Sequence, residues 1–323
     1  MQMETPDPGT VPAVQYQRFG TPEVLRVVSV SAPTAGPHDL VVGVRSISVN
    51  RIDTAARAGR YKIMSGRRLP QPTGLDFSGT VLSAGPQTHG FKPGQQVWGF
   101  LGTDRLGKQG TAAAQIAVDA DLVAPAPASG DLADLAALPL VGVTAWQALE
   151  EFNLEAGSRL LIVGGAGGVG STAIQVARAR GVLVDTISSA RHEELLRQLG
   201  AESRFDPDAV PWPTLAGRYQ AVLDTVGKNL WRLRRTLASS GRLITISAAG
   251  VPMTLLSKIL PGPTASFMSV KPSPAGLAAL ADLVERGQLA PIIRARFPLS
   301  EIPQAHAMVE TGHGAGKVIV DIG

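Results

Sequence analysis

Residues 160–171 read Leu-Leu-Ile-Val-Gly-Gly-Ala-Gly-Gly-Val-Gly-Ser and lead directly into a helical pattern at 172–179. This is the order of a buried strand, a tight turn and a helix, and Gly165, Gly167 and Gly170 have the spacing G-x-G-x-x-G. Glycine permits positive φ in the turn, and the missing Cβ lets a pyrophosphate approach the backbone, where the helix presents unpaired N–H groups. The stretch predicts a dinucleotide-binding turn. The alternative is a glycine-rich turn that only packs a helix on a sheet.

Strands and helices alternate around this turn. We expect strands at 159–163, 183–188, 221–225, 242–247 and 267–270, and helices at 170–179, 192–199 and 230–238. Such alternation predicts a parallel, doubly wound sheet that binds its ligand at the carboxyl ends of the strands. The chain before about residue 137 consists of short β-type runs separated by Gly and Pro turns, and it ends with a helix at 276–287 and a strand at 316–320.

The composition bounds the class of protein. A chain of 323 residues with 44% hydrophobic and 17% charged residues is long enough for about two globular domains. There is no apolar run of membrane-spanning length, and residues 1–10 are polar and Pro-rich without a signal core, so we expect a cytoplasmic protein without a membrane partner. The net charge of +4 invites a nucleic-acid partner, but only 5% of the residues are aromatic, so we expect none.

The end of the second predicted strand indicates which dinucleotide binds. In NAD sites an acidic residue at this place binds the ribose 2′-hydroxyl. Here the side chains are Ser188, Ser189, Arg191 and His192, which suit a 2′-phosphate and favour NADPH. Asp185 is the counter-evidence, because an earlier strand end would leave it near the ribose. We place Asp185 inside the strand.

Several segments together resemble the medium-chain dehydrogenase/reductase superfamily, in its zinc-independent quinone oxidoreductase (zeta-crystallin-like) branch. The resemblance runs from about residue 13 to the end, in the order of that family. Besides the glycine-rich turn, its segments are S-V-N-R-I-D at 48–53, G-R-Y at 59–61, P-T-G-L-D-F-S-G at 72–79, A-A-L-P-L at 136–140, T-A-W at 144–146, L-G-A at 199–201, L-D-T-V-G at 223–227 and G-K-V at 316–318.

The resemblance implies an α/β fold with two domains and the cofactor in the cleft between them. A GroES-like β-rich catalytic domain would comprise residues 1–138 and 271–323, and a Rossmann domain with a doubly wound parallel sheet would comprise 139–270. It also implies a homodimer formed through the Rossmann sheet. We expect the cofactor-binding residues to be Asn50, Thr144, Gly167, Gly168, Val169, Gly170, Ser188, Ser189, Arg191, His192, Val226, Ser247, Phe267 and Lys317.

The residues argue against a catalytic zinc. Zinc-dependent members of the superfamily have a Cys near the position of Asn50 and a His-Glu pair after the glycine that matches Gly74, where this chain has Leu75 and Asp76. The chain contains no Cys, and its five His residues are scattered without ligand spacing, so we interpret them as surface residues. We therefore expect no metal.

Without a metal, reduction depends on positioning and on hydrogen bonds to the developing oxyanion. The resemblance places Asn50 and Tyr61 near the nicotinamide, and we expect both to be catalytic, with Tyr61 or water as the proton donor. The alternatives are that Tyr61 is an ordinary loop residue and that Asn50 caps a short helix. On that helix we expect Asp53 and Arg57 to form an i,i+4 ion pair.

The sequence departs from related quinone reductases at two positions. Ala55 stands where some of them have a second active-site Tyr, and Pro207 replaces a Tyr that helps to hold the adenosine phosphate in some members. We predict an NADPH-dependent oxidoreductase that transfers hydride to a small-molecule quinone or α,β-unsaturated carbonyl (enone). The alternatives are a carbonyl reductase or other tailoring enzyme of a biosynthetic pathway, and an NADPH-binding protein without turnover.

Overall fold

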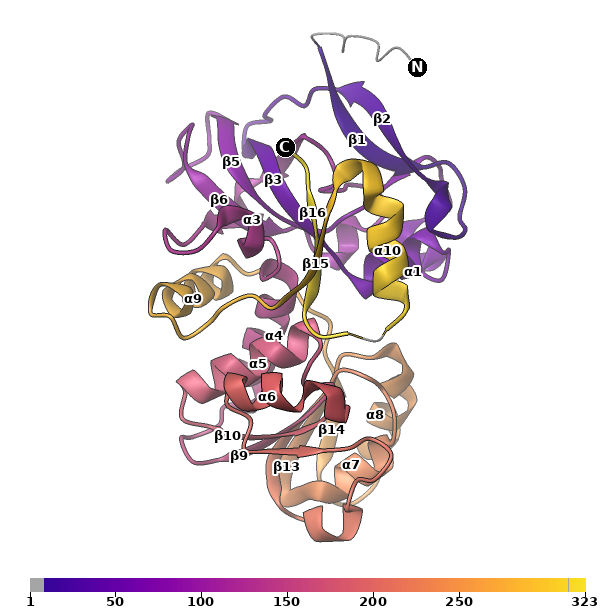
Figure 1. The fold of residues 1–323 in the computed structure, drawn as a ribbon, viewed down its shortest axis with the longest axis vertical. Coiled ribbons are helices and arrows are strands. Elements are labelled where there is room, and N and C mark those ends of the chain that lie inside the picture. Colours follow the sequence, from indigo (N-terminus) through magenta and orange to yellow (C-terminus); the bar gives the residue numbers. More distant parts are fainter. Residues whose placement is uncertain (1–8, 313) are drawn as a thin grey trace.

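The computed structural model describes residues 9–312 and 314–323, so most of the expected polar head at 1–10 lies outside the described residues. Figure 1 shows two bodies stacked along the long axis, with the first and the last strands in the upper one. The lower body is built around a parallel sheet and the upper one around two mainly antiparallel sheets. The glycine-rich turn lies where the two bodies meet.

The lower body contains a six-stranded parallel sheet in the order β11-β10-β9-β12-β13-β14. Numbered from its first strand, this is the order 3-2-1-4-5-6 of a doubly wound dinucleotide-binding fold. The central strand β9 reads Arg-Leu-Leu-Ile-Val and is buried after its first residue, as expected for a strand covered on both faces. The strands are β9 (Arg159–Val163), β10 (Leu183–Ile187), β11 (Ser203–Phe205), β12 (Tyr219–Asp224), β13 (Leu237–Thr245) and β14 (Thr264–Phe267).

Helices cover this sheet. The one that follows the turn, α5 (Gly168–Ala179), has small and aliphatic residues on its buried face, so it packs closely against the sheet and against α4 (Pro139–Phe152). On the other side of α4 lies α9 (Pro274–Glu285). The remaining helices of the lower body are α6 (Glu193–Leu199), α7 (Leu230–Thr236) and α8 (Val251–Ser257).

The upper body joins both ends of the chain. Its seven-stranded sheet has the order β15-β16-β3-β5-β6-β8, with β7 also paired to β3, and β16 runs antiparallel to β3. Figure 1 shows the last strands in yellow beside the indigo β3. The strands are β3 (Asp39–Val49), β5 (Asp76–Ala84), β6 (Gln96–Phe100), β7 (Gln115–Asp119), β8 (Val123–Pro125), β15 (Ile293–Pro298) and β16 (Lys317–Asp321).

A smaller sheet and four helices complete the upper body. The sheet has the order β2-β1-β4. Its strands are β1 (Thr10–Tyr16), β2 (Leu25–Ser31) and β4 (Gln71–Pro72), and the helices are α1 (Arg51–Arg57), α2 (Lys62–Ser65), α3 (Leu132–Leu135) and α10 (Ile302–Glu310). Two large hydrophobic clusters fill the upper body and the space around α4 and α5, and a third lies between the parallel sheet and α7.

Some element boundaries differ from the sequence predictions. The last strand of the parallel sheet ends at Phe267, where we expected it to begin. Its sequence, Thr-Ala-Ser-Phe, is short and half polar, so the hydrophobic pattern does not mark it. The helix expected at 230–238 ends at Thr236, and β13 begins at once and continues to Thr245. The strands β11 and β15 were missed.

The helices of the described residues are short. The longest, α4, has 14 residues, whereas a membrane-spanning helix needs about 20. Within 9–312 and 314–323, none of the helices is both long and apolar enough to cross a membrane.

Candidate cofactor and active site

The glycine-rich turn owes its shape to close backbone contacts. Gly164 has a φ of +85°, which favours glycine. A Cβ on Gly170 would lie 2.3 Å from the carbonyl oxygen of Gly164, and one on Gly165 would lie 2.7 Å from Oγ1 of Thr186. Gly165 and Gly170 therefore hold the helix close to the first two strands of the sheet.

Gly167 has a different role from its neighbours. It precedes α5 with ordinary extended angles, φ −69° and ψ 170°, and a Cβ there would meet only the Gly164 oxygen, at 3.4 Å. It is partly exposed, as are Gly168 and Val169. The amides of residues 168–170 are the first of the helix and have no acceptor within it. The turn thus leaves open backbone and free N–H groups, which fit the pyrophosphate of a dinucleotide.

The other expected cofactor residues lie at the same edge of the sheet. Ser188, Ser189, Arg191 and His192 follow the carboxyl end of β10, Val226 follows β12, Ser247 follows β13, and Phe267 ends β14. The sites of Gly227 and Ser247 touch, since a Cβ on Gly227 would lie 2.3 Å from Oγ of Ser247. The structure therefore brings these residues into one row of loops.

The second strand resolves the position of Asp185. This residue lies within β10, as expected, and is fully buried. Its carboxylate accepts hydrogen bonds from Tyr219 Oη (2.8 Å) and Arg159 Nη1 (3.2 Å). Arg159 and Tyr219 begin β9 and β12. Asp185 therefore points toward the amino ends of the strands, away from the turn.

The two basic residues after β10, Arg191 and His192, differ in exposure and in charge. Arg191 is exposed and belongs to none of the ion pairs found among the described residues. Burial, Arg191 and Arg294 lower the pKa of His192, which favours its neutral form. The guanidinium of Arg191 is thus the free positive charge at the strand end, and His192 adds hydrogen-bonding capacity.

The loop after β12 is held by a buried acid. Asp224 accepts hydrogen bonds from the amides of Val226 and Gly227 at 3.0 Å and from Thr245 Oγ1 at 2.7 Å. The hydrogen bonds of the motif Leu-Asp-Thr-Val-Gly therefore fix this loop beside the turn. It leaves Val226 exposed at the cofactor edge.

On the opposite side of the turn lies a buried charged cluster, formed by Asn50, Asp53, Asp76 and Lys317. Lys317 Nζ donates to Oδ1 of Asn50 and to the Val49 carbonyl. The side-chain Nδ2 of Asn50 donates to Oδ1 of Asp76 (3.2 Å), and the backbone N–H of Asn50 donates to Oδ2 of Asp53 (2.8 Å). The cluster joins the start of α1 to β5 and β16.

The cluster lies against the turn. Gly316 N donates to the Ala166 carbonyl at 2.9 Å. A Cβ on Gly168 would lie 2.7 Å from Cδ of Lys317. The structure therefore brings together Asn50, Lys317 and Gly168, three of the expected cofactor residues.

Burial governs the ionisation of the cluster. It raises the pKa of Asp53 to about 7, with a further increase from the charge of Asp76. Burial also raises the pKa of Asp76 and lowers that of Lys317, and the attraction between the ammonium and the carboxylates opposes both changes.

Asn50 both caps α1 and faces Lys317. Together with Asp53 it forms a capping box at the start of that helix, so the alternative considered from the sequence is confirmed. The expected Asp53–Arg57 ion pair is wrong. Arg57 pairs with Glu310 of α10 and donates to the Gly20 carbonyl, because α10 packs against α1.

Two expected site residues are less directly linked to the cluster. Tyr61 precedes α2 and is partly buried against the upper core. Thr144 is buried in α4, and its hydroxyl donates to the Leu140 carbonyl at 2.7 Å. Among the hydrogen bonds of the described residues, none joins either side chain to the cluster.

The histidines are not all surface residues. His306 is 1% exposed on α10, and burial with nearby Arg57 lowers its pKa to about 3. His38 and His89 are exposed, and His313 lies outside the described residues. In the part of the chain that the structure describes, no group of three or more His, Cys, Asp or Glu side chains is arranged to hold a metal ion.

Sequence reasoning missed Asp53 and Asp76 as members of the site. A signal was present, because Asp76 begins a strand that is otherwise apolar or small, and Lys317 begins the strand Lys-Val-Ile-Val-Asp. A charge at a buried strand position needs a partner. The sequence does not show which charges meet, since these two lie 241 positions apart.

Comparisons with known proteins agree with this geometry. Residues 36–128 match the model of the alcohol dehydrogenase GroES-like domain, and residues 199–320 match that of the zinc-binding dehydrogenase. The chain is 30% identical to the mitochondrial NAD(P)H oxidoreductase RTN4IP1 of Bos taurus, over 98% of this chain and 91% of that protein. It is also 30% identical to 2-methylene-furan-3-one reductase of Solanum lycopersicum, over 97% and 79% of the two chains.

A solved structure gives the same result. The quinone oxidoreductase of Coxiella burnetii is 28% identical and superposes with a TM-score of 0.89, over 97% of this chain and all of that one. Its likeness covers both bodies and the turn between them. The chain therefore belongs to the medium-chain dehydrogenase/reductase superfamily, in the branch of the quinone and enone oxidoreductases.

Proposed function

We propose that this protein is an NADPH-dependent oxidoreductase that transfers hydride to a quinone or to the C=C bond of an α,β-unsaturated carbonyl. The observation that carries the proposal is the contact between the glycine-rich turn and the Asn50–Lys317 pair, with Gly168 directly against Lys317. A dinucleotide whose pyrophosphate lies on the turn extends toward this pair. Relatives named as reductases of enone-type and quinone substrates support the reaction class.

The lower body supplies binding. The free amides at 168–170 receive the pyrophosphate, and Val226, Ser247 and Phe267 line the edge along which the nucleotide lies. Ser188, Ser189, His192 and Arg191 lie where the 2′-phosphate of NADPH would be held. Asp185, the acid that would repel this phosphate, is engaged at the other end of the strands.

The upper body supplies orientation and the proton. Bound NADPH supplies the hydride. Asn50 is fixed by bonds to Lys317, Asp76 and Asp53 and presents its amide beside the turn. Tyr61 precedes the exposed residues Ile63 and Met64 at the start of α2, and its hydroxyl supplies the proton to the acceptor. From α4 in the lower body, Thr144 orients the nicotinamide ribose or amide.

Several further features belong to the same proposal. The reaction needs no zinc. Residues 1–138 with 271–323 form the catalytic domain, and residues 139–270 form the nucleotide-binding domain.

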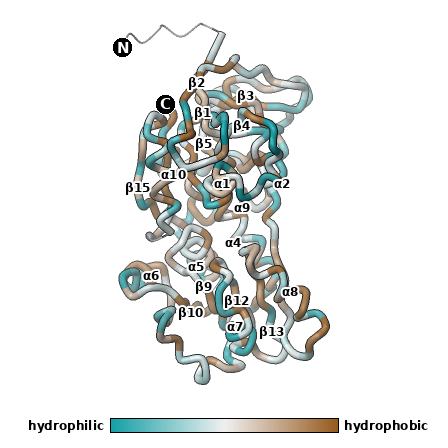
Figure 2. The backbone as a smooth tube through the Cα atoms, turned by 90° about the vertical axis from the view of Figure 1, so that its right-hand side faces the viewer, coloured by the Kyte–Doolittle hydropathy of each residue, from teal (hydrophilic) through white to brown (hydrophobic). Residues whose placement is uncertain are grey.

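Two copies associate through the lower body, where the edge strand β14 lies beside α8 and the exposed Leu255, Leu256 and Ile259. Figure 2 shows the chain at α8 partly in brown. We place the protein in the cytoplasm, which cell fractionation tests, and light scattering tests the dimer.

The reaction is tested by oxidation of NADPH, with NADH in parallel, against quinones, enones, enoyl thioesters and simple aldehydes. Turnover with quinones or enones and a strong preference for NADPH supports the proposal. Turnover with aldehydes alone identifies a carbonyl reductase instead. NADPH binding with no turnover of any acceptor contradicts the enzymatic role.

The matched variants are Gly167→Asp and Gly167→Ala. The structure has room for a side chain at this position, so neither variant needs to disturb the fold. The carboxylate repels the pyrophosphate, and we expect NADPH binding to be lost in Gly167→Asp and weakened less in Gly167→Ala. Unchanged binding in Gly167→Asp contradicts the placement of the pyrophosphate on this turn.

A further inference from the structure

The buried charged cluster contains more acidic groups than basic groups. Asp53, Asp76 and Lys317 are the ionisable members, and their side chains are 7% exposed or less. Two carboxylates against one ammonium leave a net negative charge when all three ionise. A buried uncompensated charge is costly, so one carboxyl group is favoured to keep its proton.

The hydrogen bonds indicate which carboxyl group that is. Both oxygens of Asp76 accept Ser48 Oγ at 2.8 Å, and Oδ1 also accepts from the Asn50 side chain. Asp53 accepts one bond, from the Asn50 amide to Oδ2, and its buried Oδ1 has no partner among the described residues. Burial raises the pKa of both groups, but the hydrogen bonds favour the anionic form of Asp76 more than that of Asp53, so Asp53 is the carboxyl group that better holds a proton.

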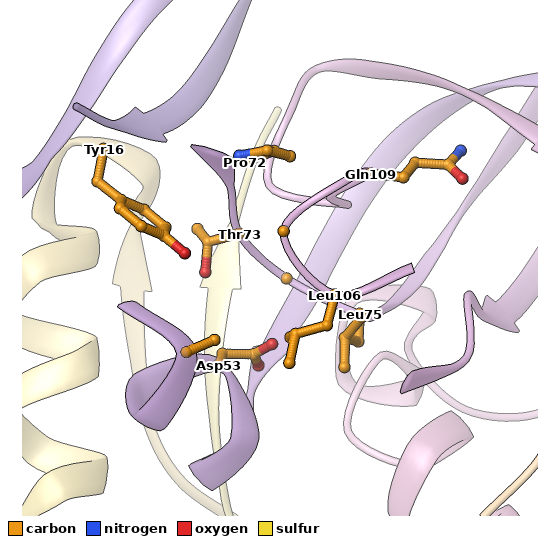
Figure 3. Close-up of a pocket in the computed structure, with 10 residues that line it drawn as sticks. Tyr16, Asp53, Pro72, Thr73, Leu75, Leu106 and Gln109 are labelled. Carbon is orange, nitrogen blue, oxygen red and sulfur yellow. The ribbon is translucent and has the colours of Figure 1, made fainter. Parts of the chain in front are cut away.

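A small cavity lies beside Asp53. It has a volume of about 10 Å³ and is lined by Asp53, Tyr16, Thr73 and Leu106 among others. Figure 3 shows the carboxyl group of Asp53 and the hydroxyl of Tyr16 facing this space. A cavity of this size accommodates about one water molecule, which gives the Asp53 proton an acceptor other than a protein side chain.

The other ionisable groups around Asp53 lie on β1, α1, α10, β5 and β16. Burial raises the pKa of Tyr16 on β1 far above neutrality and lowers that of His306 on α10 to about 3, so both are neutral. Arg57 on α1 is paired with Glu310 of α10. From β5 and β16 come Asp76, which raises the pKa of Asp53, and Lys317, which lowers it. The lining loop contributes Leu106, Gly107 and Gln109, which do not ionise.

The cluster also touches the turn on which the proposed cofactor would lie. Lys317 touches Gly168 at the turn and Asn50 within the cluster. The nicotinamide ring is neutral in NADPH and positively charged in NADP⁺. Charges interact strongly across a site from which water is excluded, so a positive ring favours the ionised form of a nearby carboxyl group.

We propose that Asp53 is a positioning residue that couples one proton to the oxidation state of the bound cofactor. The inference rests on the proposed function. Asp53 is protonated while NADPH is bound and becomes a carboxylate when the ring carries its positive charge. Its O–H bond breaks, water in the cavity relays the proton to solvent, and the hydride electron pair goes to the acceptor. Asp53 regains a proton from solvent when NADP⁺ leaves, so protons balance over a cycle.

The test is calorimetric titration of the full-length protein with NADP⁺ and with NADPH, at pH 7, in two buffers of different ionisation enthalpy. Both ligands carry the 2′-phosphate, so the difference between them isolates the charge of the ring. We expect NADP⁺ binding to release about half a proton more than NADPH binding. The difference vanishes in Asp53→Asn, which keeps an oxygen acceptor for the Asn50 amide, and persists in the exposed control Asp208→Asn.

A second measurement covers the case in which Asp53→Asn does not fold. In the wild type, the ratio of the NADP⁺ and NADPH dissociation constants should shift toward tighter NADP⁺ binding by about threefold or more between pH 6 and 8. Equal proton release for the two ligands, a constant ratio, or a difference that survives in Asp53→Asn overturns the inference while leaving the proposed function intact. If neither ligand binds, the proposed function and the inference both fail.

Discussion

Two regions that each contain a buried acid meet at the glycine-rich turn, and the surroundings of the two acids differ. Asp224, in the loop after β12, is fully buried and accepts hydrogen bonds from two backbone amides and one hydroxyl. Asp53, at the start of α1, is almost equally buried but accepts one hydrogen bond and leaves an oxygen without a partner.

This contrast separates an acid that fixes a loop from one that we propose to be functional. The donors around Asp224 use its carboxyl group to hold the loop after β12 in place. The surroundings of Asp53 leave its charge dependent on pH and on neighbouring charges, and burial raises its pKa to about 7. Burial alone therefore does not distinguish these two carboxyl groups, whereas their hydrogen-bond partners do.

The largest effect is expected from Asp224→Asn. The new amide group places N–H donors against backbone N–H groups, so at least one buried donor loses its acceptor. We expect the free energy of unfolding to fall by about 3 kcal/mol, measured by denaturant titration. The exposed Asp208→Asn serves as the control. A loss no larger than that of the control would show that Asp224 does not hold the loop.

Within the turn, Gly170→Ala should cost more stability than Gly167→Ala. The added methyl at 170 lies 2.3 Å from the Gly164 oxygen, whereas at 167 the nearest contact is 3.4 Å away. We expect losses of about 2 kcal/mol and about 0.5 kcal/mol or less in the free energy of unfolding. Equal losses in thermal or denaturant unfolding would contradict the division of the turn into packed and open glycines.

Arg191→Ala tests the phosphate side of the first region. Removing the unpaired guanidinium should weaken NADPH binding about tenfold and leave NADH binding unchanged, as measured by fluorescence titration. Arg197→Ala removes an exposed arginine of α6 that pairs with Glu194, three positions earlier. This variant should change neither NADPH nor NADH binding. A parallel loss for both cofactors would remove Arg191 from the 2′-phosphate site.

Asp53 also imposes a pH dependence on stability. Its pKa rises from 3.8 to about 7 on folding, so the folded state holds the proton more tightly than the unfolded state. Wild-type stability should therefore fall relative to Asp53→Asn as the pH rises from about 4 to about 7, by roughly 3 kcal/mol. Parallel denaturation profiles for the two proteins across this range would mean that Asp53 is ionised in the folded state.

The first region could be predicted from the sequence because its signals are local. The run at 160–171 and the polar residues after β10 each lie within about a dozen positions of one another, and period and turn chemistry determine their structure. The same reasoning correctly placed Asp185 inside its strand. It failed at β14, whose short, half-polar sequence gives little hydrophobic signal.

The second region could be predicted only in part, since its members come from α1, β5 and β16. The family resemblance pointed to Asn50 and Lys317, but the contact of Lys317 with Asn50, which itself bonds both carboxyl groups, depends on the last strand lying beside β3. The expected Asp53–Arg57 pair failed for the same reason. Arg57 pairs with Glu310, 253 positions away, instead of with Asp53, four positions away on the same helix.

Hydride transfer itself is tested most directly with NADPH that carries deuterium at C4 of the nicotinamide, on the face from which the hydride is removed. The wild-type protein, given an enone, should consume the labelled NADPH and yield a saturated ketone with deuterium at its β carbon. Gly167→Asp should yield none. Consumption of the label without its appearance in the product, or equal activity of Gly167→Asp, would contradict a reaction carried out by a cofactor bound on the glycine-rich turn.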